Sequence, residues 1–449
     1  MKSLPKILIG QKPSYKKISE DEDFFALFQK IEQEFKTCFL FESLGEEGKF
    51  SRYSIIGFDP ESIISARGNT LAINGNDYLV DNPYYSLREI MPKPVLSREF
   101  AGGFVGYLSY DSINYIEPTI NVKVHNDFDQ FMFGVYTDGI IYDKLTNEIF
   151  YFYYKKDRSN NINKILKKEI IPQEFTAKFL RDTLTKEEHE KSVERIKNQI
   201  LDGKTFQCEV GFKSEYTISG NPLVLYERLR QLNPSPFMYY LKFDNKKIIG
   251  SSPELLFSLR DGEMTSNPLA GTTRRGRTAI EDQQLARELL NDPKEIAEHT
   301  MLVDMHRNDI GKVAQFGTVK VRNLMTIKRF SHVQHISSEV VGLIRPGEDM
   351  FSGLASNFPM PTVCGTPRVE TVKIIDANEP EPRGPYGGGV GHFGFNGDAT
   401  FALALRSFFV CDNYGYAQTS GGIVADSVPQ KEYEEIQNKL AAMKKVLTI

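Results

Sequence analysis

Two pairs of glutamates have the same spacing in this 449-residue sequence. Glu295 and Glu298 follow Pro293, and Glu432 and Glu435 stand near the C-terminus. Residues three apart share one face of a helix, so each pair would present two carboxylates side by side. If the pairs met, they would form an oxygen-only site of the kind that Mg²⁺ prefers. Two solvated helix faces would have the same spacing, and spacing alone does not show convergence.

Three glycine-rich stretches could bind an anion. They are residues 358–368, 383–391 and 421–427. Where glycines remove Cβ atoms, main-chain N–H groups can approach a ligand closely and point at its negative charge. Ordinary tight turns use the same residues, so each run alone is a weak signal.

Helices would have to position the glutamates. Residues 279–308 have a helical pattern, which is broken at Pro293 because proline disrupts a helix interior. The C-terminal segment carries Lys439 one turn beyond Glu435 and has an apolar stripe at helical spacing. The stripe consists of Tyr433, Ile436, Leu440, Met443 and Leu447.

The first part of the chain predicts antiparallel strands. Short aromatic and β-branched runs between turn signals favour a sandwich-like arrangement. These runs are residues 37–43, 52–57, 102–108, 140–142 and 149–153. The polar, basic residues 155–168 then predict a boundary between two lobes.

A helix is predicted next, because Thr185 and Glu188 can form a capping box and Gly203 can end it. Residues 222–232 predict a second helix, and residues 237–243 with 247–250 predict a hairpin.

Between those helices, residues 206–213 alternate between apolar and polar side chains. Gln207, Glu209 and Lys213 fall on one face of the predicted strand. That face could line a site or meet water, and water is the commoner case.

Composition excludes several classes of function. With 55 basic and 59 acidic residues, the net charge of −4 gives no electrostatic case for a nucleic acid or an anionic membrane. Since no apolar run reaches the length of a membrane span and the N-terminus lacks a signal-peptide core, we expect a cytoplasmic protein. The 4 cysteines are far apart, and His332 and His335 lack a third ligand nearby, so no disulfide framework or zinc site is indicated.

Taken together, the motifs resemble those of the chorismate-utilising enzymes, most closely the large, synthase components of anthranilate synthases. The resemblance spans nearly the whole chain. It rests on residues 41–43, 52–54, 103–107, 233–238, 250–256, 268–272, 298–304, 307–309, 332–336, 383–391 and 423–429.

The resemblance implies an α+β fold in which helices wrap an antiparallel β-sandwich core built by two interwoven lobes. Residues 1–170 would form an N-terminal domain that contributes to the sandwich and to a tryptophan feedback site. Residues 180–449 would form the catalytic domain that binds chorismate.

The resemblance also assigns roles to residues. Glu298 and Glu435 would bind Mg²⁺ directly, with Glu295 and Glu432 ligating it or supporting it through water. The catalytic residues would be Glu254 as the general acid for the departing hydroxyl, His335 for proton movement at the ring, and Thr272 and Gln207. The substrate-binding residues would be Thr362, Tyr386, Arg406, Ser420, Gly421, Gly422 and Lys439.

Two positions bear on the nucleophile. Relatives that add water place a lysine where this chain has Gln207, and glutamine cannot act as that base. Relatives that make 4-amino-4-deoxychorismate place a lysine nucleophile where this chain has Ala270, and alanine offers no covalent route. The resemblance therefore implies attack by ammonia and conversion of chorismate to anthranilate and pyruvate. An aminodeoxychorismate synthase of the para-aminobenzoate pathway stays the alternative, with a non-catalytic chorismate-binding protein less favoured.

Partners follow from the same resemblance. Ammonia would come from a separate glutamine amidotransferase subunit, in a heterotetramer with two copies of each subunit. Tryptophan would inhibit through a pocket formed by Glu42, Ser43, Arg52, Pro234, Ser235, Phe237 and Met238.

Several positions depart from the usual family pattern, and together they could reshape the substrate pocket. They are Met360, Pro361, Cys364, Thr273, Phe212, His306 and residues 419–421.

Overall fold

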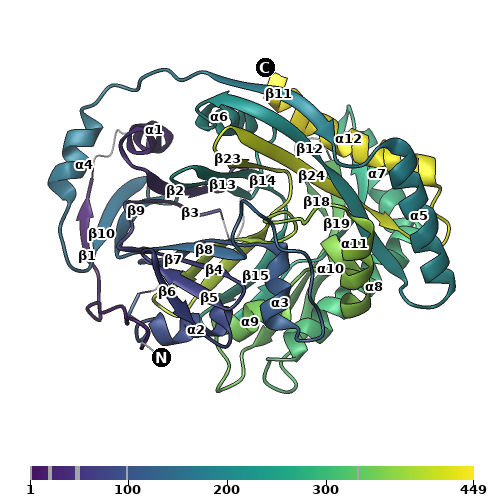
Figure 1. The fold of residues 1–449 in the computed structure, drawn as a ribbon, viewed down its shortest axis with the longest axis horizontal. Helices are drawn as coiled ribbons and strands as arrows, with labels where there is room; N and C mark the ends of the chain where they lie inside the picture. Colours follow the sequence, from purple (N-terminus) through teal and green to yellow (C-terminus); the bar gives the residue numbers. More distant parts are fainter. Residues whose placement is uncertain (1–2, 19–22, 46–50, 98–99, 331–332, 449) are drawn as a thin grey trace.

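Two antiparallel sheets of 12 strands each form the centre of the molecule, which we describe from a computed structural model (Figure 1). The structure describes residues 3–18, 23–45, 51–97, 100–330 and 333–448. His332, considered above as a metal ligand, lies outside these residues. The α+β sandwich expected from the resemblance is confirmed.

The first sheet contains, in spatial order, β1 (Ser14–Lys17), β10 (Glu148–Tyr153), β9 (Asp138–Asp143), β3 (Tyr53–Phe58), β2 (Thr37–Glu42), β13 (Phe237–Phe243), β14 (Lys246–Ser252), β23 (Ser407–Cys411), β24 (Tyr414–Ile423), β12 (Gln207–Gly220) and β11 (Phe175–Asp182), with β20 (Gly365–Thr366) paired to β12. The second sheet contains β17 (Leu269–Arg274), β19 (Val333–Leu343), β16 (Glu263–Ser266), β15 (Leu255–Arg260), β22 (Ala399–Leu403), β21 (Gly389–Gly394), β7 (Gly103–Leu108), β8 (Phe131–Tyr136), β4 (Ser62–Arg67), β5 (Thr70–Ile73) and β6 (Asn76–Leu79), with β18 (Lys320–Arg329) paired to β19.

Each sheet is assembled from both ends of the chain. In the first sheet β2 pairs with β13, so that Leu40 lies opposite Tyr240. In the second sheet β7 pairs with β21, so that Phe104 lies opposite Phe393. The interwoven arrangement therefore consists of two long-range strand pairings, one in each sheet.

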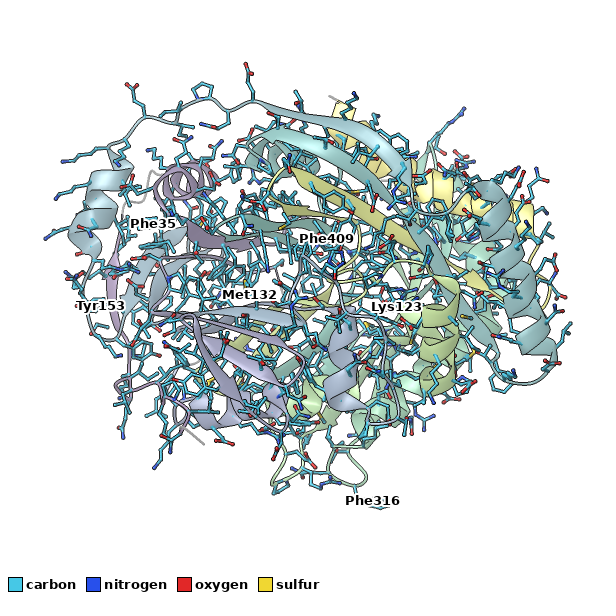
Figure 2. All side chains as sticks on the ribbon, in the orientation of Figure 1. Phe35, Lys123, Met132, Tyr153, Phe316 and Phe409 are labelled. Atoms are coloured by element: carbon cyan, nitrogen blue, oxygen red, sulfur yellow. The ribbon has the colours of Figure 1, made fainter. Side chains whose placement is uncertain are left out.

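Aromatic side chains fill the space between the sheets. One buried cluster joins Phe39 and Phe409 of the first sheet to Tyr107 and Val390 of the second. Figure 2 shows Phe409 in the interior, whereas Phe316 lies at the tip of a protruding loop and is fully exposed. Burial of such large apolar surfaces is the main favourable contribution to folding.

Helices cover the outer faces of both sheets (Figure 1). The first sheet packs against α1 (Phe24–Glu34), α4 (Ser159–Leu166), α6 (Leu223–Leu232) and α12 (Pro429–Thr448). The second sheet packs against α2 (Pro83–Ile90), α3 (Ile113–Ile116), α8 (Pro293–Gly311), α9 (Met350–Ser356) and α11 (Arg368–Asn378). The remaining helical segments are η1 (Tyr110–Ser112), α5 (Lys186–Leu201), α7 (Ala279–Asn291) and α10 (Pro361–Cys364).

Local sequence signals explain several of these boundaries. The predicted capping box is confirmed, because the Thr185 side chain accepts from the Glu188 amide while the Glu188 carboxylate accepts from Thr185. The break at Pro293 is confirmed as well: the proline is the first residue of α8, where its missing N–H costs nothing. The predicted hairpin is confirmed as β13 and β14. None of the helices in the described ranges is long and apolar enough to cross a membrane.

One helix was not predicted from the sequence. Residues 155–168 were expected to contain a boundary between two lobes, and within them Ser159–Leu166 forms α4. Ile162 and Ile165 of this helix are buried against the first sheet. Burial of these two isoleucines outweighs the turn preference of the Ser-Asn-Asn sequence at its start.

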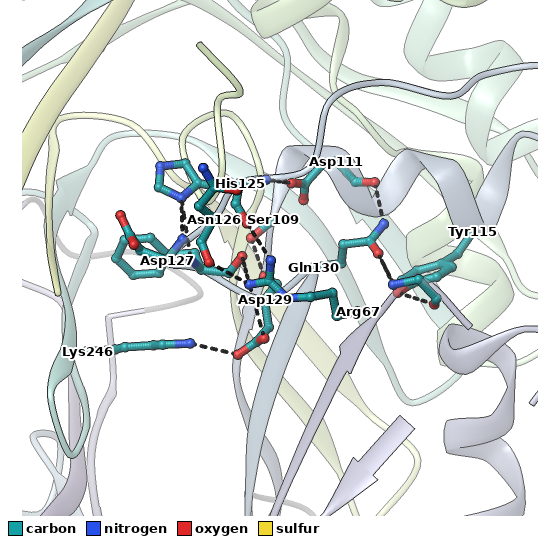
Figure 3. A network of polar contacts seen from close by, with 12 residues as sticks. Arg67, Ser109, Asp111, Tyr115, His125, Asn126, Asp127, Asp129, Gln130 and Lys246 are labelled. Carbon is teal, nitrogen blue, oxygen red and sulfur yellow. Dashed lines mark hydrogen bonds and ion pairs between the residues drawn. The ribbon is translucent and has the colours of Figure 1, made fainter. Parts of the chain in front are cut away.

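A polar network ties the two sheets together at one end (Figure 3). The Lys246 ammonium of β14 pairs with the Asp129 carboxylate at 2.8 Å, and the Arg67 guanidinium of β4 donates to the carbonyl of His125 at 3.0 Å. The His125 ring in turn stacks on Tyr416 of β24 with ring centroids 5.5 Å apart. Tyr416 donates its hydroxyl hydrogen to the carbonyl of Arg383 at 2.9 Å. The network thus fixes the start of the glycine-rich run at 383–391.

Candidate active site

A buried acid and an arginine lie at the ends of four strands. Glu254 stands between β14 and β15 and is 3% exposed. Its carboxyl accepts a hydrogen bond from Thr362 Oγ1 at 2.8 Å. Burial raises the pKa of Glu254 to about 8, against the opposing effects of the Thr362 hydrogen bond and the Arg406 charge. A carboxyl group held protonated near neutral pH can donate a proton.

Arg406 connects β22 to β23 in a left-handed backbone conformation, with φ at +48°. Such a conformation is uncommon outside glycine and is retained where the surroundings impose it. Within the described part of the chain, its guanidinium makes neither a hydrogen bond nor an ion pair. A half-buried guanidinium without a protein partner is suited to bind a carboxylate from a ligand.

His335 of β19 faces β17. Its Nδ1 lies 3.0 Å from the carbonyl oxygen of Gly271 and 3.0 Å from Thr272 Oγ1. Since a carbonyl can only accept, Nδ1 carries the proton and Nε2 is left as an acceptor. Nε2 is buried without a partner, and burial lowers the pKa of His335 to about 4. The imidazole is therefore neutral and can accept a proton.

The last glycine-rich run meets the start of β12. Ser420 Oγ lies 2.9 Å from the Tyr386 hydroxyl, and Lys439 Nζ donates to the Ser420 carbonyl at 2.9 Å. A Cβ atom on Gly422 would lie 2.7 Å from the Gln207 side-chain nitrogen, and one on Gly421 would lie 3.5 Å from a Glu432 oxygen. The structure thus brings seven predicted residues to one place, although their roles stay predictions.

The polar face of β12 is buried, which corrects the expectation that it meets water. Glu209 is 9% exposed and Lys213 is 2% exposed. Residues distant in the sequence contact these side chains: Ser420 Oγ donates to the Glu209 carboxylate at 2.8 Å, and Lys213 Nζ lies 4.4 Å from the centre of the Tyr416 ring. The Arg383 guanidinium donates to the Glu209 carbonyl at 2.9 Å and pairs with the Glu379 carboxylate at 2.7 Å.

Glu209 is a polar residue of this site that the sequence analysis did not assign. Its carboxylate accepts from Ser420 Oγ at 2.8 Å and lies 3.5 Å from the Gln207 side-chain nitrogen. Burial raises the pKa of Glu209, while the charges of Lys439 and Arg383 oppose that rise. The alternation at 206–213 could have identified it, because it places Glu209 on the same face as Gln207.

The four glutamates of the predicted metal site come from α8 and α12. Burial and repulsion from Glu298 raise the pKa of Glu295, and burial with repulsion from Glu435 raises that of Glu432. Attraction by Glu298, Glu295 and Glu432 raises the pKa of Lys294. Carboxylates of both helices therefore act on the same group, the Lys294 ammonium.

These oxygens fit a hard divalent cation in type and charge. As the side chains stand, the described residues include no group of three or more His, Cys, Asp or Glu that could hold a metal. Mg²⁺ binding therefore stays a prediction. A Cβ atom on Gly271 would lie 2.8 Å from a Glu295 oxygen, so this carboxylate lies beside the strand that also contacts His335.

Five of the predicted tryptophan residues line two cavities, and the larger cavity is also lined by Pro253 and Leu255 on either side of Glu254. Glu42, Phe237 and Met238 line a cavity of about 160 Å³ between the sheets, with aromatic walls that include Phe41. Ser43, Pro234 and Phe237 line a neighbouring cavity of about 620 Å³.

The charged groups of this region already have partners. The Glu42 carboxylate pairs with Arg230 at 2.6 Å, and Arg52 pairs with Asp143 at 2.6 Å. Ser235 Oγ lies 2.8 Å from Ser251 Oγ. The buried Ser43 Oγ has no hydrogen-bond partner among the residues that the structure describes.

Known proteins are similar in sequence to this chain over nearly its whole length. The sequence model described as chorismate binding enzyme matches residues 36–445. Anthranilate synthase component 1 of Leptospira biflexa is 51% identical over 100% of this chain and 98% of its own length. The protein of the same name from Methanothermobacter thermautotrophicus is 40% identical over 96% of this chain and 93% of its own length.

Solved structures of other proteins share the fold of this chain. The crystal structure of anthranilate synthase component I from Streptococcus pneumoniae superposes with a TM-score of 0.78 at 30% identity, over 89% of this chain and 93% of that one. The menaquinone-specific isochorismate synthase of Escherichia coli gives 0.77 at 19% identity, over 100% and 96%, and supports the fold alone.

The fold and the site together define an enzyme built on a two-sheet α+β sandwich. The chain belongs to the chorismate binding enzyme family, as its match to the family over residues 36–445 shows.

Proposed function

We propose that the chain is the synthase component of an anthranilate synthase, which converts chorismate and ammonia to anthranilate and pyruvate in tryptophan biosynthesis. The names of relatives that are 51% and 40% identical over almost the whole chain support this function. The observation that carries it is the position of Glu254, with a pKa raised to about 8, near Arg406, whose guanidinium has no hydrogen-bond or ion-pair partner among the described residues.

The chain's own residues would bind and orient the substrate. Arg406, Tyr386 and Thr362 would hold the enolpyruvyl carboxylate, with the main chain at Ser420–Gly422 as a close-fitting wall. Glu254 would protonate the departing ring hydroxyl, which then leaves as water. The unprotonated Nε2 of His335 would accept the ring proton that is removed when pyruvate is eliminated.

Glu298 and Glu435 would hold Mg²⁺, supported by Glu295 and Glu432. When bound, the cation would neutralise the ring carboxylate and the charge developing on the departing oxygen. The mutual repulsion within the two glutamate pairs supports this assignment, because a cation would relieve it.

Two residues favour ammonia as the nucleophile. Gln207 supplies no lysine-like base for activating water, and Ala270 supplies no amine for a covalent intermediate. An aminodeoxychorismate synthase is the alternative, and product analysis separates it from the proposed activity.

Ammonia would come from a glutaminase partner in a cytoplasmic heterotetramer with two copies of each subunit. Tryptophan would inhibit by occupying the cavity beside Glu42 and Met238, whose aromatic walls suit an indole ring.

The test is to mix the purified chain with chorismate, MgCl₂ and an ammonium salt at about pH 8.5 and to separate the products by chromatography. Anthranilate with pyruvate in equal amounts is the expected result. Aminodeoxychorismate would support the alternative, salicylate would contradict the assignment of Gln207, and absence of any product would overturn the proposal.

A further inference from the structure

Glu209 is a buried carboxylate for which the proposed mechanism so far has no use. One carboxylate oxygen accepts from Ser420 Oγ at 2.8 Å, and the other has, among the described residues, a single long contact of 3.5 Å with the Gln207 side-chain nitrogen. Within the described residues no ion pair involves this carboxylate. An acceptor that is buried but incompletely hydrogen-bonded is costly, so its retention requires a physical reason.

The position of the carboxylate relative to Gln207 supplies one. Both side chains lie against Gly422, where a Cβ atom would come within 2.7 Å of each. Only glycine leaves this space open. Because Gln207 Oε1 can also accept a hydrogen bond, the two side chains together offer two acceptor oxygens and one amide donor. A small molecule that carries several N–H groups is the complementary ligand.

From this geometry we infer that Glu209 and Gln207 bind the ammonia nucleophile and that Glu209 accepts the proton which the nitrogen loses. The inference rests on the proposed function. The nitrogen lone pair forms the bond to the ring carbon while the ring C–O bond breaks toward oxygen. Oxygen takes a proton from Glu254 and leaves as water, and the positively charged nitrogen gives one proton to the Glu209 carboxylate. One proton has then moved from Glu254 to Glu209, and a neutral amine remains on the ring.

Burial and neighbouring charges determine how readily the Glu209 carboxylate accepts a proton. Burial raises its pKa and so strengthens it as a base, Glu435 acts in the same direction, and Lys439 and Arg383 oppose it. The negative charge of Glu209 also contributes to the raised pKa values of Glu254 and Tyr386. Protonation of Glu209 at low pH removes the acceptor, so turnover measured at a fixed concentration of free ammonia has an acidic limb that a glutamine in its place abolishes.

The experiment separates the two half-reactions. Glu209→Gln keeps the size of the side chain, and we expect it to lower kcat with chorismate and an ammonium salt by about 100-fold. We expect the same variant to eliminate pyruvate at the wild-type rate from the aminated ring intermediate supplied directly, because that step needs no nucleophile. Glu209→Asp should recover part of the ammonia-dependent rate and the acidic limb.

Three results would overturn the inference: wild-type ammonia-dependent turnover in Glu209→Gln, an equal loss in both half-reactions, or an unchanged acidic limb. Wild-type enzyme that makes no anthranilate from ammonia would instead refute the proposed function. Phe212→Leu on the same strand is the control for strand packing, and it should leave the ratio of the two half-reaction rates unchanged.

Discussion

The candidate active site and the predicted tryptophan region differ in how their charged side chains are paired. In the active site, the described residues offer no hydrogen-bond partner to the Arg406 guanidinium or to His335 Nε2, and Glu209 is only partly hydrogen-bonded. In the tryptophan region, Glu42 is bound by Arg230 and by the Tyr226 hydroxyl at 2.8 Å. Unsatisfied buried groups cost stability, and they persist where a ligand completes them.

The contrast indicates how each region would recognise its ligand. A doubly charged substrate needs free charges and a protonated acid, which the active site provides. An effector that binds mainly through an aromatic ring needs a preformed apolar cavity, and pairing Glu42 internally leaves such a cavity between the sheets. The following predictions test this contrast in order of decreasing effect.

Removing one predicted metal ligand should have the largest effect. Glu298→Gln is expected to lower Mg²⁺-dependent turnover by about 1000-fold, because one charge that binds the cation is lost. The measurement is the rate of anthranilate formation as a function of MgCl₂ concentration. Glu434→Gln is the control, since Glu434 is exposed on α12 and bonded to Gln430. Equal effects in the two variants would remove the metal assignment.

Two arginines give a direct test of the contrast. Arg406→Gln should raise KM for chorismate and lower kcat/KM by about 100-fold, because a charge-assisted hydrogen bond to the substrate is lost. Arg230→Gln should keep kcat/KM within about twofold but lower the unfolding free energy by about 1–3 kcal/mol, since Glu42 loses its partner. Steady-state kinetics and urea denaturation measure these quantities. A kinetic loss in Arg230→Gln without a loss of stability, together with a loss of stability in Arg406→Gln without a kinetic loss, would refute the contrast.

The raised pKa of Glu254 predicts a pH dependence of both activity and stability. The acid form is lost as pH rises through about 8, so kcat/KM for chorismate at saturating free ammonia should fall about tenfold per unit above that pH. Because the folded pKa exceeds the ordinary value of 4.5, the contribution of this group to stability declines between pH 4.5 and about 8.

Glu254→Gln isolates this effect. The side chain of the variant cannot release a proton. The Tm of the variant minus that of the wild type should therefore increase as pH rises from 4.5 to about 8. A constant Tm difference would show that Glu254 is ionised in the folded protein at neutral pH.

The smallest effect is expected at Ser43. Its buried hydroxyl has no partner, so Ser43→Ala should leave the unfolding free energy unchanged and weaken tryptophan binding about fivefold. Ser251→Ala is the matched control: Ser251 Oγ lies 2.8 Å from Ser235 Oγ, and its loss should cost about 1 kcal/mol. Calorimetric titration with tryptophan gives the binding constant. An unchanged affinity in Ser43→Ala would place the effector elsewhere.

Local signals made much of the fold predictable. The capping box at Thr185, the break at Pro293 and the hairpin at 237–250 depend on residues close together in the sequence, and all three are confirmed. The helix at 159–166 was missed because its stability comes from packing against the first sheet. Residue preferences cannot report a contact of that kind.

The site shows the same limit. Alternation in β12 placed Gln207 and Glu209 on one face but could not show that face to be buried, because Arg383 lies far away in the sequence. The glutamate spacing identified two helix faces. Their common effect on Lys294 became visible only when α8 and α12 were placed in space. The sequence thus specified which side chains share an element, and tertiary packing determined which elements meet.

The pairing of β2 with β13 and of β7 with β21 has a consequence for how the chain is made. During synthesis, β2 and β7 are made before β13 and β21, so one edge of each stays unpaired until the partner strand has been made. Such non-local pairing raises the contact order, which slows folding and prolongs exposure to aggregation. Neither pairing can form until β13 and β21 have been synthesised, so each sheet joins its two parts only after much of the chain has been made.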